Sequence, residues 1–286
     1  GDLAVFTAYL GWLSFLPRMI GRALARRKQA GIAFERMSAL VADRDARNTV
    51  QARDLPIGRS TERRGTAHVV RPERVPLQQL DVVGLTAQYA SGAGVEDISF
   101  TIRRGDFVVV TGAVGSGKST LLRAVLGLAW QAELTGTVAG EVRWNGRVLE
   151  DRQSFLVPPN AAFLPQVPQL ISDSLATNVA FGDVDPERVR EALRLTEMDR
   201  DLAEMPEGLG TLIGPRGLRL SGGQRQRLAG ARAVVHAPEL VVLDDLSSAL
   251  DVETELRVWQ HLAEAGMTVL AVSHRAVAFE RADRVL

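Results

Sequence analysis

A glycine-rich turn between an apolar run and a helix-forming stretch is the feature of this chain that most narrows its possible folds. Residues 107–111 are largely apolar, residues 112–120 read Gly-Ala-Val-Gly-Ser-Gly-Lys-Ser-Thr, and residues 121–128 favour a helix. A short, continuous apolar run is typical of a strand that is buried on both faces, as in α/β proteins. The sequence therefore predicts a buried strand that enters a helix through a glycine-rich loop.

This loop matches the pattern G-x-x-x-x-G-K-[ST] in the strand-to-helix context that the pattern requires. Small residues let successive backbone N–H groups point at a dense negative charge, and the helix start adds the positive end of its dipole. Lys118 is expected to reach the β- and γ-phosphates of a nucleotide, and the Ser119 hydroxyl to bind Mg²⁺. A plain glycine-rich turn is the alternative. The predicted nucleotide contacts of the loop are Gly112, Ala113, Val114, Gly115, Ser116, Gly117, Lys118, Ser119 and Thr120.

Further short runs extend this pattern along the chain. The expected strands are residues 80–83, 98–102, 240–243 and 268–272, and residues 186–205 have helical spacing. Buried parallel strands that alternate with helical stretches predict an α/β domain with helices on both faces of its sheet.

Two carboxylates follow the apolar run at 240–243. Asp244 ends the expected strand, and a carboxylate in that position can hold Mg²⁺ through its water shell. A strand that ends in a capping Asp is the alternative. Asp245 comes next, at the position from which a base would orient an attacking water.

Composition removes some classes of function. Lys+Arg and Asp+Glu are both 34, so overall charge gives no reason to expect a nucleic-acid partner. The chain has no cysteine, which excludes disulfide frameworks and thiolate metal sites and suits the reducing cytosol.

Residues 220–224, Leu-Ser-Gly-Gly-Gln, resemble the signature of the ABC family, and Arg-Gln-Arg follows them. The resemblance implies that Ser221, Gly222, Gly223 and Gln224 bind the γ-phosphate of a nucleotide held by the opposite subunit. A Ser-Gly-Gly turn that caps a helix is the alternative for the tripeptide alone. With the motifs that follow, the resemblance covers the chain from about residue 77 to its end.

Four more residues are similar to family motifs and occur in the family's order. Gln166, in Phe-Leu-Pro-Gln, resembles the Q-loop glutamine that contacts Mg²⁺ or its water. Asp251 resembles the end of the D-loop, and His274 resembles the switch histidine that contacts the γ-phosphate. Tyr89 resembles the aromatic residue that stacks on adenine, although an aromatic residue in an early strand is more often part of a core.

The resemblance also implies a fold and a reaction. The implied fold is α/β, with a P-loop NTPase (RecA-like) core, a small antiparallel β subdomain and an α-helical signature subdomain, preceded by a membrane-helix remnant. The implied ligands are ATP and Mg²⁺. The metal residues would be Ser119, Gln166 and Asp244, and the catalytic residues Lys118, Gln166, Asp245 and His274.

The start of the chain carries an apolar stretch. Residues 3–17 have no charge, and fifteen helical residues span roughly 22 Å, less than the ~30 Å core of a bilayer. A buried helix and a signal-peptide core are alternatives, but Asp2 stands where a signal peptide carries positive charge. Basic residues follow the stretch, as at cytoplasmic ends of membrane helices. We therefore expect a membrane helix that is clipped at its start.

The expected organisation has three parts. They are residues 1–42, the last membrane helix and its cytoplasmic extension; residues 43–76, a polar linker; and residues 77–286, the nucleotide-binding domain. The chain begins without Met, and residues 284–286 look like the opening of a strand, so we expect a fragment that is truncated at its C-terminal end.

Two further segments resemble exporters within the family. Residues 173–175 resemble the segment that faces coupling helices, and residues 211–214 resemble the X-loop, with Leu212 where an acid is usual. The resemblance implies ATP-powered export by a half-transporter in the inner (plasma) membrane, with the cassette on the cytoplasmic side. A soluble ABC ATPase in DNA or translation work and a nucleotide-dependent regulatory module are the alternatives.

Asp245 departs from the family pattern, because members with strong hydrolysis carry Glu at that position. Asp is one methylene shorter, which draws the carboxylate back by roughly 1.5 Å, and misplacement on the order of 1 Å can cost about a hundredfold in rate. The signature is intact. This combination resembles one half of heterodimeric exporters, which often pairs a poor catalytic carboxylate with a good signature. The resemblance therefore implies a heterodimer with a second half-transporter, in which the site on this chain's own loop is slow.

Overall fold

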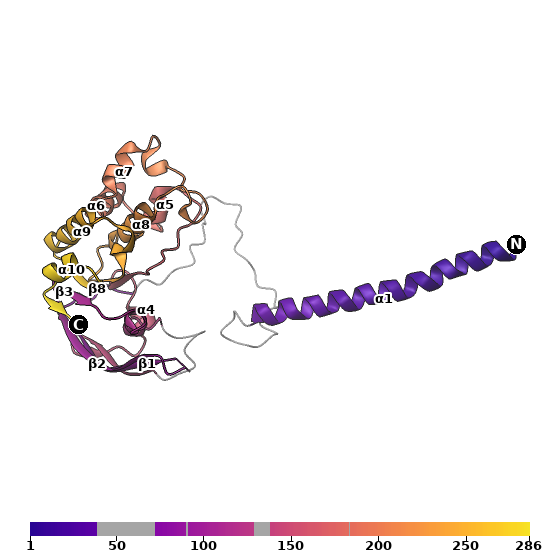
Figure 1. Ribbon diagram of the computed structural model, residues 1–286, viewed down its shortest axis with the longest axis horizontal. Helices are drawn as coiled ribbons and strands as arrows, with labels where there is room; N and C mark the ends of the chain where they lie inside the picture. The colour runs from indigo at the N-terminus through magenta and orange to yellow at the C-terminus, as the bar shows by residue number, and fades with distance from the viewer. Residues whose placement is uncertain (39–71, 90, 129–137, 183) are drawn as a thin grey trace. The chain divides into compact units, whose positions relative to one another are not determined.

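The computed structural model describes residues 1–38, 72–89, 91–128, 138–182 and 184–286, and the chain divides into two units, Gly1–Val69 and Val70–Leu286. The described part of the first unit is one helix, α1 (Asp2–Ser38), with Pro17 inside it (Figure 1). Among the described residues, no helix is both long enough and apolar enough to cross a membrane. Residues 43–71 of the predicted linker lie outside the described residues.

The last residues of the predicted linker belong to the second unit and pack within it. Arg74 forms an ion pair with Glu239, with 2.9 Å between NH1 and Oε1, and the Val75 amide donates to Asn160 Oδ1 at 2.8 Å. Trp144 Nε1 donates to the Val75 carbonyl oxygen at 3.2 Å. The chain is therefore fixed to this unit before its first strand begins.

An antiparallel sheet forms one layer of the second unit. Its strands are β1 (Gln79–Gln88), β2 (Gly94–Arg103), β4 (Val138–Trp144) and β5 (Arg147–Val148), in the order β2-β1-β4-β5. Leu80 pairs with Ile102 on one side and with Trp144 on the other. The expected strands at 80–83 and 98–102 are confirmed, whereas the strand at 138–144 was not among those the sequence predicted.

A parallel sheet forms the centre of the unit. Its strands are β6 (Ala161–Leu164), β7 (Leu240–Asp244), β8 (Thr268–Val272), β3 (Phe107–Val110) and β9 (Arg284–Val285), in the order β6-β7-β8-β3-β9. Every position of β3, β7 and β8 is buried, which explains why these strands read as continuous apolar runs. The strand opening expected near the chain end is confirmed as β9, which pairs with β3.

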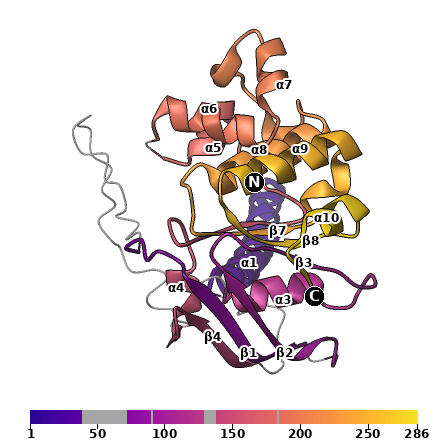
Figure 2. The same cartoon turned by 90° about the vertical axis from the view of Figure 1, so that its left-hand side faces the viewer.

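Alternate side chains of the parallel sheet enter two different cores. Phe107 and Val109 pack in a core shared with the helices of the second unit. Val108 and Val110 pack in another, shared with the antiparallel sheet and α3 (Lys118–Val125). Figure 2 shows α3 between the two sheets, with α8 (Gly222–Val234) and α9 (Val252–Glu264) across the parallel sheet. The predicted α/β domain with helices on both faces is therefore confirmed.

The helical stretch predicted at 186–205 is confirmed, and it consists of two helices with a break between them. They are α6 (Pro186–Leu195) and α7 (Asp199–Glu204). Between them Glu197 has a φ of 58°, and its buried carboxylate accepts from Arg257 Nε of α9 at 2.8 Å. A residue in the left-handed conformation commonly ends a helix. The contact with α9 cannot be predicted from the spacing of residues within the stretch.

The remaining elements are short. They are the helices α4 (Arg152–Phe155), α5 (Leu175–Ala180) and α10 (Ala276–Arg281), and the 3₁₀ turns η1 (Gly208–Gly210), η2 (Pro215–Gly217) and η3 (Leu246–Ala249). α5, α6 and α8 pack together beside η1 and α7, and these elements form a helical layer apart from the antiparallel sheet (Figures 1 and 2).

Candidate nucleotide site

The candidate residues gather at the carboxyl ends of the parallel strands. The segment after β3 carries Lys118, the segment after β6 carries Gln166, β7 ends at Asp244 and continues into Asp245, and His274 follows β8. β7 and β8 pair in parallel, as do β3 and β8 and β6 and β7, so all four ends lie at one edge of the sheet. Ligands of open α/β sheets bind at this edge.

The loop between β3 and α3 depends on glycine at its last residue. Gly117 is the N-cap of α3 with a φ of 92°. A Cβ atom at this position would lie 2.7 Å from the Gly94 carbonyl oxygen and 2.8 Å from Val95 Cγ1. Both the backbone conformation and the space therefore exclude a larger residue. The loop is held against the start of β2.

The Lys118 side chain folds back over the loop that precedes it. Its ammonium donates to the carbonyl oxygens of Gly112 at 2.9 Å and Ala113 at 2.7 Å, and lies 3.4 Å from Ser116 Oγ. Of the 34 Lys and Arg residues, only Lys28 and Lys118 are lysine. A compact ammonium fits inside a tight backbone loop where a planar guanidinium does not.

Ser119 and Asp244 join the loop to β7. Ser119 Oγ donates to Asp244 Oδ1 at 3.0 Å, and Asp244 is 2% exposed. Burial raises the pKa of the Asp244 carboxyl, while the hydrogen bond from Ser119 lowers it. Asp244 Oδ2 is buried and has no hydrogen-bond partner in the described part of the chain. A buried carboxylate oxygen without a donor, beside a serine hydroxyl, fits a hard divalent cation.

The described residues contain no group of three or more His, Cys, Asp and Glu that could hold a metal by itself. A cation at Ser119 and Asp244 therefore needs further oxygen ligands. Mg²⁺ is usually held in this way, with one or two protein oxygens completed by phosphate and water.

Asp245 occupies a left-handed turn directly after Asp244. Its φ is 55°, and its amide donates to the Val272 carbonyl oxygen of β8 at 3.2 Å. Gln166 Nε2 lies 3.4 Å from Asp245 Oδ2. The structure thus brings together the candidate glutamine and the candidate water-orienting carboxylate from separate strands.

His274 lies at the end of β8 with an exposed side chain. Its neighbours are firmly held, since the Ser273 amide donates to the Val110 carbonyl oxygen at 3.3 Å. Arg275 NH1 donates to the Leu250 carbonyl oxygen at 2.8 Å and to the buried Glu255 at 3.0 Å. Sequence reasoning gave Arg275 and Glu255 no role, because their meeting depends on how β8 and α9 pack.

Tyr89 follows β1 and reaches the start of α3. Its hydroxyl lies 3.4 Å from Thr120 Oγ1, and its amide donates to the Ala93 carbonyl oxygen at 2.8 Å. Thr120 is 7% exposed. The predicted aromatic residue therefore lies next to the loop, on the side of the antiparallel sheet.

The signature residues begin α8. Ser221 is the N-cap: its Oγ accepts from the Gln224 amide at 3.2 Å, while Gln224 Oε1 accepts from the Ser221 amide at 2.8 Å. This reciprocal pair is a capping box. Gln224 Nε2 also donates to Asp201 of α7 at 2.8 Å. A Cβ at Gly223 would lie 2.9 Å from the Ala249 carbonyl oxygen, so the helix start packs tightly on η3.

Asp251 caps α9. Its Oδ1 accepts from the Thr254 amide at 2.9 Å, and this backbone hydrogen bond is the largest of the effects that lower the pKa of the exposed carboxyl. The side chains of Ser247 and Ser248, in the expected D-loop region, lie outside the described part of the chain.

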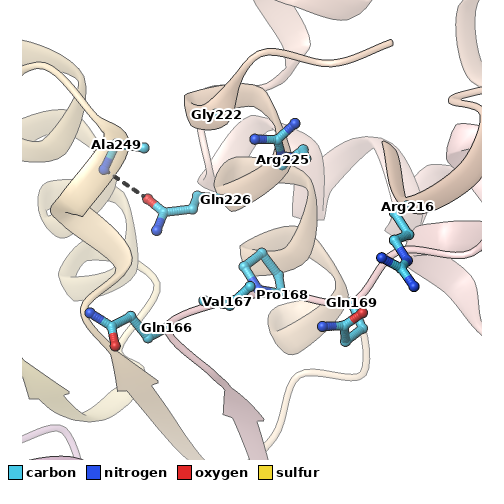
Figure 3. A pocket seen from close by; sticks show the side chains of 9 residues that line it. All are labelled: Gln166, Val167, Pro168, Gln169, Arg216, Gly222, Arg225, Gln226 and Ala249. Atoms are coloured by element: carbon cyan, nitrogen blue, oxygen red, sulfur yellow. Dashed lines mark hydrogen bonds between the residues drawn. The ribbon is translucent and has the colours of Figure 1, made fainter. Parts of the chain in front are cut away.

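A hollow of about 550 Å³ lies between the segment after β6, the start of α8 and η3. Figure 3 shows the side chains that line it. They are Gln166, Val167, Pro168, Gln169, Arg216, Gly222, Arg225, Gln226 and Ala249. Sequence reasoning placed Gln166 and Gly222 at a site but missed Gln226, whose only signal was its place just after the signature.

Comparison with known proteins agrees with this geometry. Residues 95–248 match the family model described as ABC transporter. The chain is 38% identical over 195 residues to the ATP-dependent lipid A-core flippase of Burkholderia pseudomallei (strain 1710b), covering 67% of this chain and 32% of the relative. It is 32% identical over 291 residues to heavy metal tolerance factor 1 of Caenorhabditis elegans, covering 100% of this chain and 34% of the relative.

The chain thus spans about a third of the length of these curated relatives. Among solved structures, it is similar to a bacterial Atm1-family ABC exporter with ATP bound, with a TM-score of 0.65 and 24% identity. That match covers 76% of this chain and 38% of the other, and at this identity it supports the fold alone. By the family model and the fold together, the chain belongs to the ABC transporter family.

Proposed function

We propose that this chain binds and hydrolyses Mg²⁺-ATP, and that hydrolysis powers export across a membrane by a transporter of which the chain is a nucleotide-binding part. The observation that carries the proposal is the 3.0 Å contact between Ser119 Oγ and Asp244 Oδ1. These residues are 125 positions apart in sequence. Their contact places a carboxylate beside the hydroxyl of a phosphate loop, as a nucleotide-bound metal requires.

The triphosphate would bind at the loop of residues 112–120 through backbone N–H groups and the start of α3. The Lys118 ammonium, now bonded to two loop carbonyls, would turn to the β- and γ-phosphates. The phosphates carry negative charge, whereas the loop carbonyls are neutral, so the Coulomb attraction of the ammonium to the phosphates favours that exchange. The Tyr89 ring, next to Thr120, would stack on adenine.

Ser119 and Asp244 would hold Mg²⁺, with Gln166 as a further oxygen contact. Bound there, the metal would neutralise charge on the phosphate oxygens. The partnerless Asp244 Oδ2 supports this assignment, because a buried acceptor without a donor is costly unless a ligand satisfies it.

Asp245 would orient the attacking water, with Gln166 close to its carboxylate. His274, exposed at the neighbouring strand end, would contact the γ-phosphate. Positioning and charge stabilisation account for most catalysis in phosphoryl transfer, so these roles need no covalent intermediate.

The signature residues would act on the nucleotide of a partner. Ser221 is exposed and its hydroxyl lies at the N-terminus of α8, where backbone N–H groups favour an anion. The proposed partner is a second half-transporter that faces this chain head to tail, with Asp251 between the two sites. No nucleic acid is involved.

The membrane connection is proposed from the relatives and from exposed apolar side chains. Val167 is 70% exposed, Leu212 53% and Leu218 74%, and Ser174 forms an isolated bridge with Leu212. We propose that these exposed side chains meet the coupling helices of a membrane domain on the cytoplasmic side of the inner membrane. In this proposal residues 1–42 are a membrane-helix remnant, residues 43–76 a linker and residues 77–286 the nucleotide-binding domain.

The first test compares the two lysines of the chain. Lys118→Ala should abolish measurable Mg²⁺-ATP binding and turnover in the intact protein, because the loop loses its one ammonium. Lys28→Ala, which removes the lysine of α1, is the matched control and should leave ATP affinity unchanged. Lys118→Arg should also fail, because a planar guanidinium does not fit the space that the compact ammonium occupies within the loop. An unchanged affinity in Lys118→Ala would falsify the proposed nucleotide site.

The second test concerns Asp245 and the proposed heterodimer. Asp245→Glu should raise steady-state ATP turnover by up to about a hundredfold, because it moves the carboxylate outward by about one bond. Asp245→Asn is the control and should lower turnover. If the wild-type protein is already as fast as Asp245→Glu, the slow site and the argument for a heterodimer both fail.

A further inference from the structure

The turn that carries Asp245 places this residue in the left-handed region of the backbone. A non-glycine residue at a φ of 55° is uncommon, and such residues persist only where surrounding contacts over-determine them. β8 provides one such contact, from Val272 to the Asp245 amide. That hydrogen bond fixes the start of the turn. The far end of the turn, at Ala249, must be held by other groups.

Gln226 reaches both ends of this turn from α8. Its Oε1 accepts from the Ala249 amide at 3.1 Å, the bond that is drawn in Figure 3. Its Nε2 lies 3.4 Å from the Asp245 carbonyl oxygen. Gln226 is 6% exposed, so one buried amide joins the residue after β7 to the last residue of η3.

The position of Gln226 on α8 connects this turn to the signature. Gly222 and Gly223 precede it by four and three residues, so the three lie on one face of the helix. That face packs on η3, as the close approach of Gly223 to the Ala249 carbonyl oxygen also shows. Any shift of α8 is therefore transmitted to the Asp245 turn through the Gln226 amide.

We propose that Gln226 is a positioning residue for ATP hydrolysis, which fixes the Asp245 turn relative to the signature helix of the same chain. The inference rests on the proposed function. Gln226 acts on the backbone at both ends of the turn, whereas Gln166 approaches the Asp245 carboxylate itself. Its role is to set where the carboxylate stands, and nucleotide binding at the loop does not depend on it.

The test is Gln226→Met in the intact protein, since methionine keeps the length of the side chain and removes both polar contacts. We expect kcat for ATP to fall by about ten- to a hundredfold, as for a misplacement on the order of 1 Å, with KM and ATP affinity within twofold of wild type. Gln260→Met is the matched control: Gln260 donates to Glu264 on the exposed side of α9 and should leave kcat unchanged. An unchanged kcat in Gln226→Met overturns the inference, and so does an equal fall of kcat and ATP affinity.

A double-mutant cycle separates positioning from general damage. In an Asp245→Asn background, Gln226→Met should lower single-turnover hydrolysis no further, because the carboxylate it positions is already gone. A full additional loss contradicts the inference. Should Gln226→Met fail to fold, Gln226→Asn serves the same cycle, since its shorter amide cannot reach both ends of the turn.

Failure of the positioning role of Gln226 can be distinguished from failure of the proposed nucleotide site. If Lys118→Ala retains Mg²⁺-ATP affinity, the nucleotide site itself is wrong. If Lys118→Ala loses affinity while Gln226→Met keeps full kcat, the nucleotide site stands and the positioning role alone is rejected.

Discussion

The edge of the parallel sheet and the start of α8 are both suited to phosphate, yet they are assembled in different ways. At the sheet edge the contacts join distant segments, as between Ser119 and Asp244 or Gln166 and Asp245. At the start of α8, Ser221 and Gln224 bond each other within four residues, and Ser221 is exposed. In the first region, distant segments of one chain bring the candidate phosphate and metal contacts together. The second region is an exposed helix start whose cap is formed locally. Such a surface is open to a ligand held by another subunit, which agrees with its proposed role at a partner's nucleotide.

The largest effect on ATP turnover should come from a change at Asp244, the proposed metal-binding residue at the edge of the parallel sheet. Asp244→Asn should lower ATP turnover by about 10³-fold, because a bound metal supplies several kcal/mol of charge stabilisation. The same change should raise the melting temperature of the nucleotide-free protein, since it removes a buried carboxylate that has one oxygen without a partner among the described residues. A variant with wild-type turnover would show that this edge is not the metal site.

Ser221→Ala should have the next largest effect and bears directly on the difference between the regions. Losing a donor or acceptor at a transition state costs about 10²-fold in kcat, whereas ATP affinity at this chain's own loop should persist. The change also removes a helix cap, worth about 1 kcal/mol. Asp185→Ala, which removes the cap of α6, controls for that loss and should keep full turnover. Equal turnover in both variants would reduce Ser221 to a structural cap.

Tyr89 extends the comparison to the antiparallel sheet. Tyr89→Ala should weaken ATP affinity by about 1–3 kcal/mol if the ring stacks on adenine. Tyr89→Phe keeps the ring and loses only a hydroxyl at 3.4 Å from Thr120, so its affinity should match the wild type. Equilibrium titration with a fluorescent ATP analogue measures both. A loss of equal size in the two variants would indicate that the hydroxyl, and not the ring, matters.

The smallest effect should be a dependence of Mg²⁺ binding on pH. Because burial raises the pKa of Asp244, the folded, metal-free protein binds a proton more readily than the unfolded chain. The stability from this group is therefore present at low pH and is lost as pH rises through the folded pKa. Mg²⁺ needs the deprotonated carboxylate, so acidification from neutral pH should raise the Mg²⁺ concentration for half-maximal ATP binding. A requirement that stays flat on acidification would contradict this assignment.

The buried parallel strands could be predicted from sequence because a strand that is buried on both faces consists almost entirely of apolar residues. β3, β7 and β8 are buried at every position, so each reads as an unbroken apolar run. β4 has three exposed positions at its start and alternates only near its end, which gives no such run. β6 has only four residues, Ala161–Leu164, which is too short a run to predict a strand by itself.

The site could be predicted where one short segment contains both the residues that set its backbone conformation and the residues that contact the ligand. The glycine-rich loop does this, since Gly117 sets the helix start and Lys118 carries the charge. Gln226 is the opposite case. A glutamine inside a helix looks like part of a solvated face, and its burial follows from the packing of η3 on α8. Glu197 is a similar case, because its ion pair with Arg257 depends on how α9 packs.

The close approach of Gly117 to the start of β2 has a consequence for how nucleotide enters and leaves. A Cβ at Gly117 would lie 2.7 Å from the Gly94 carbonyl oxygen, so the phosphate loop packs directly against the start of β2, beside the turn that carries Tyr89. In the proposed dimer, admission and release of nucleotide would then depend on the opposing wall, formed by the helical layer and the second subunit. In that arrangement, the elements that open and close the site would lie outside the segments that hold the phosphates.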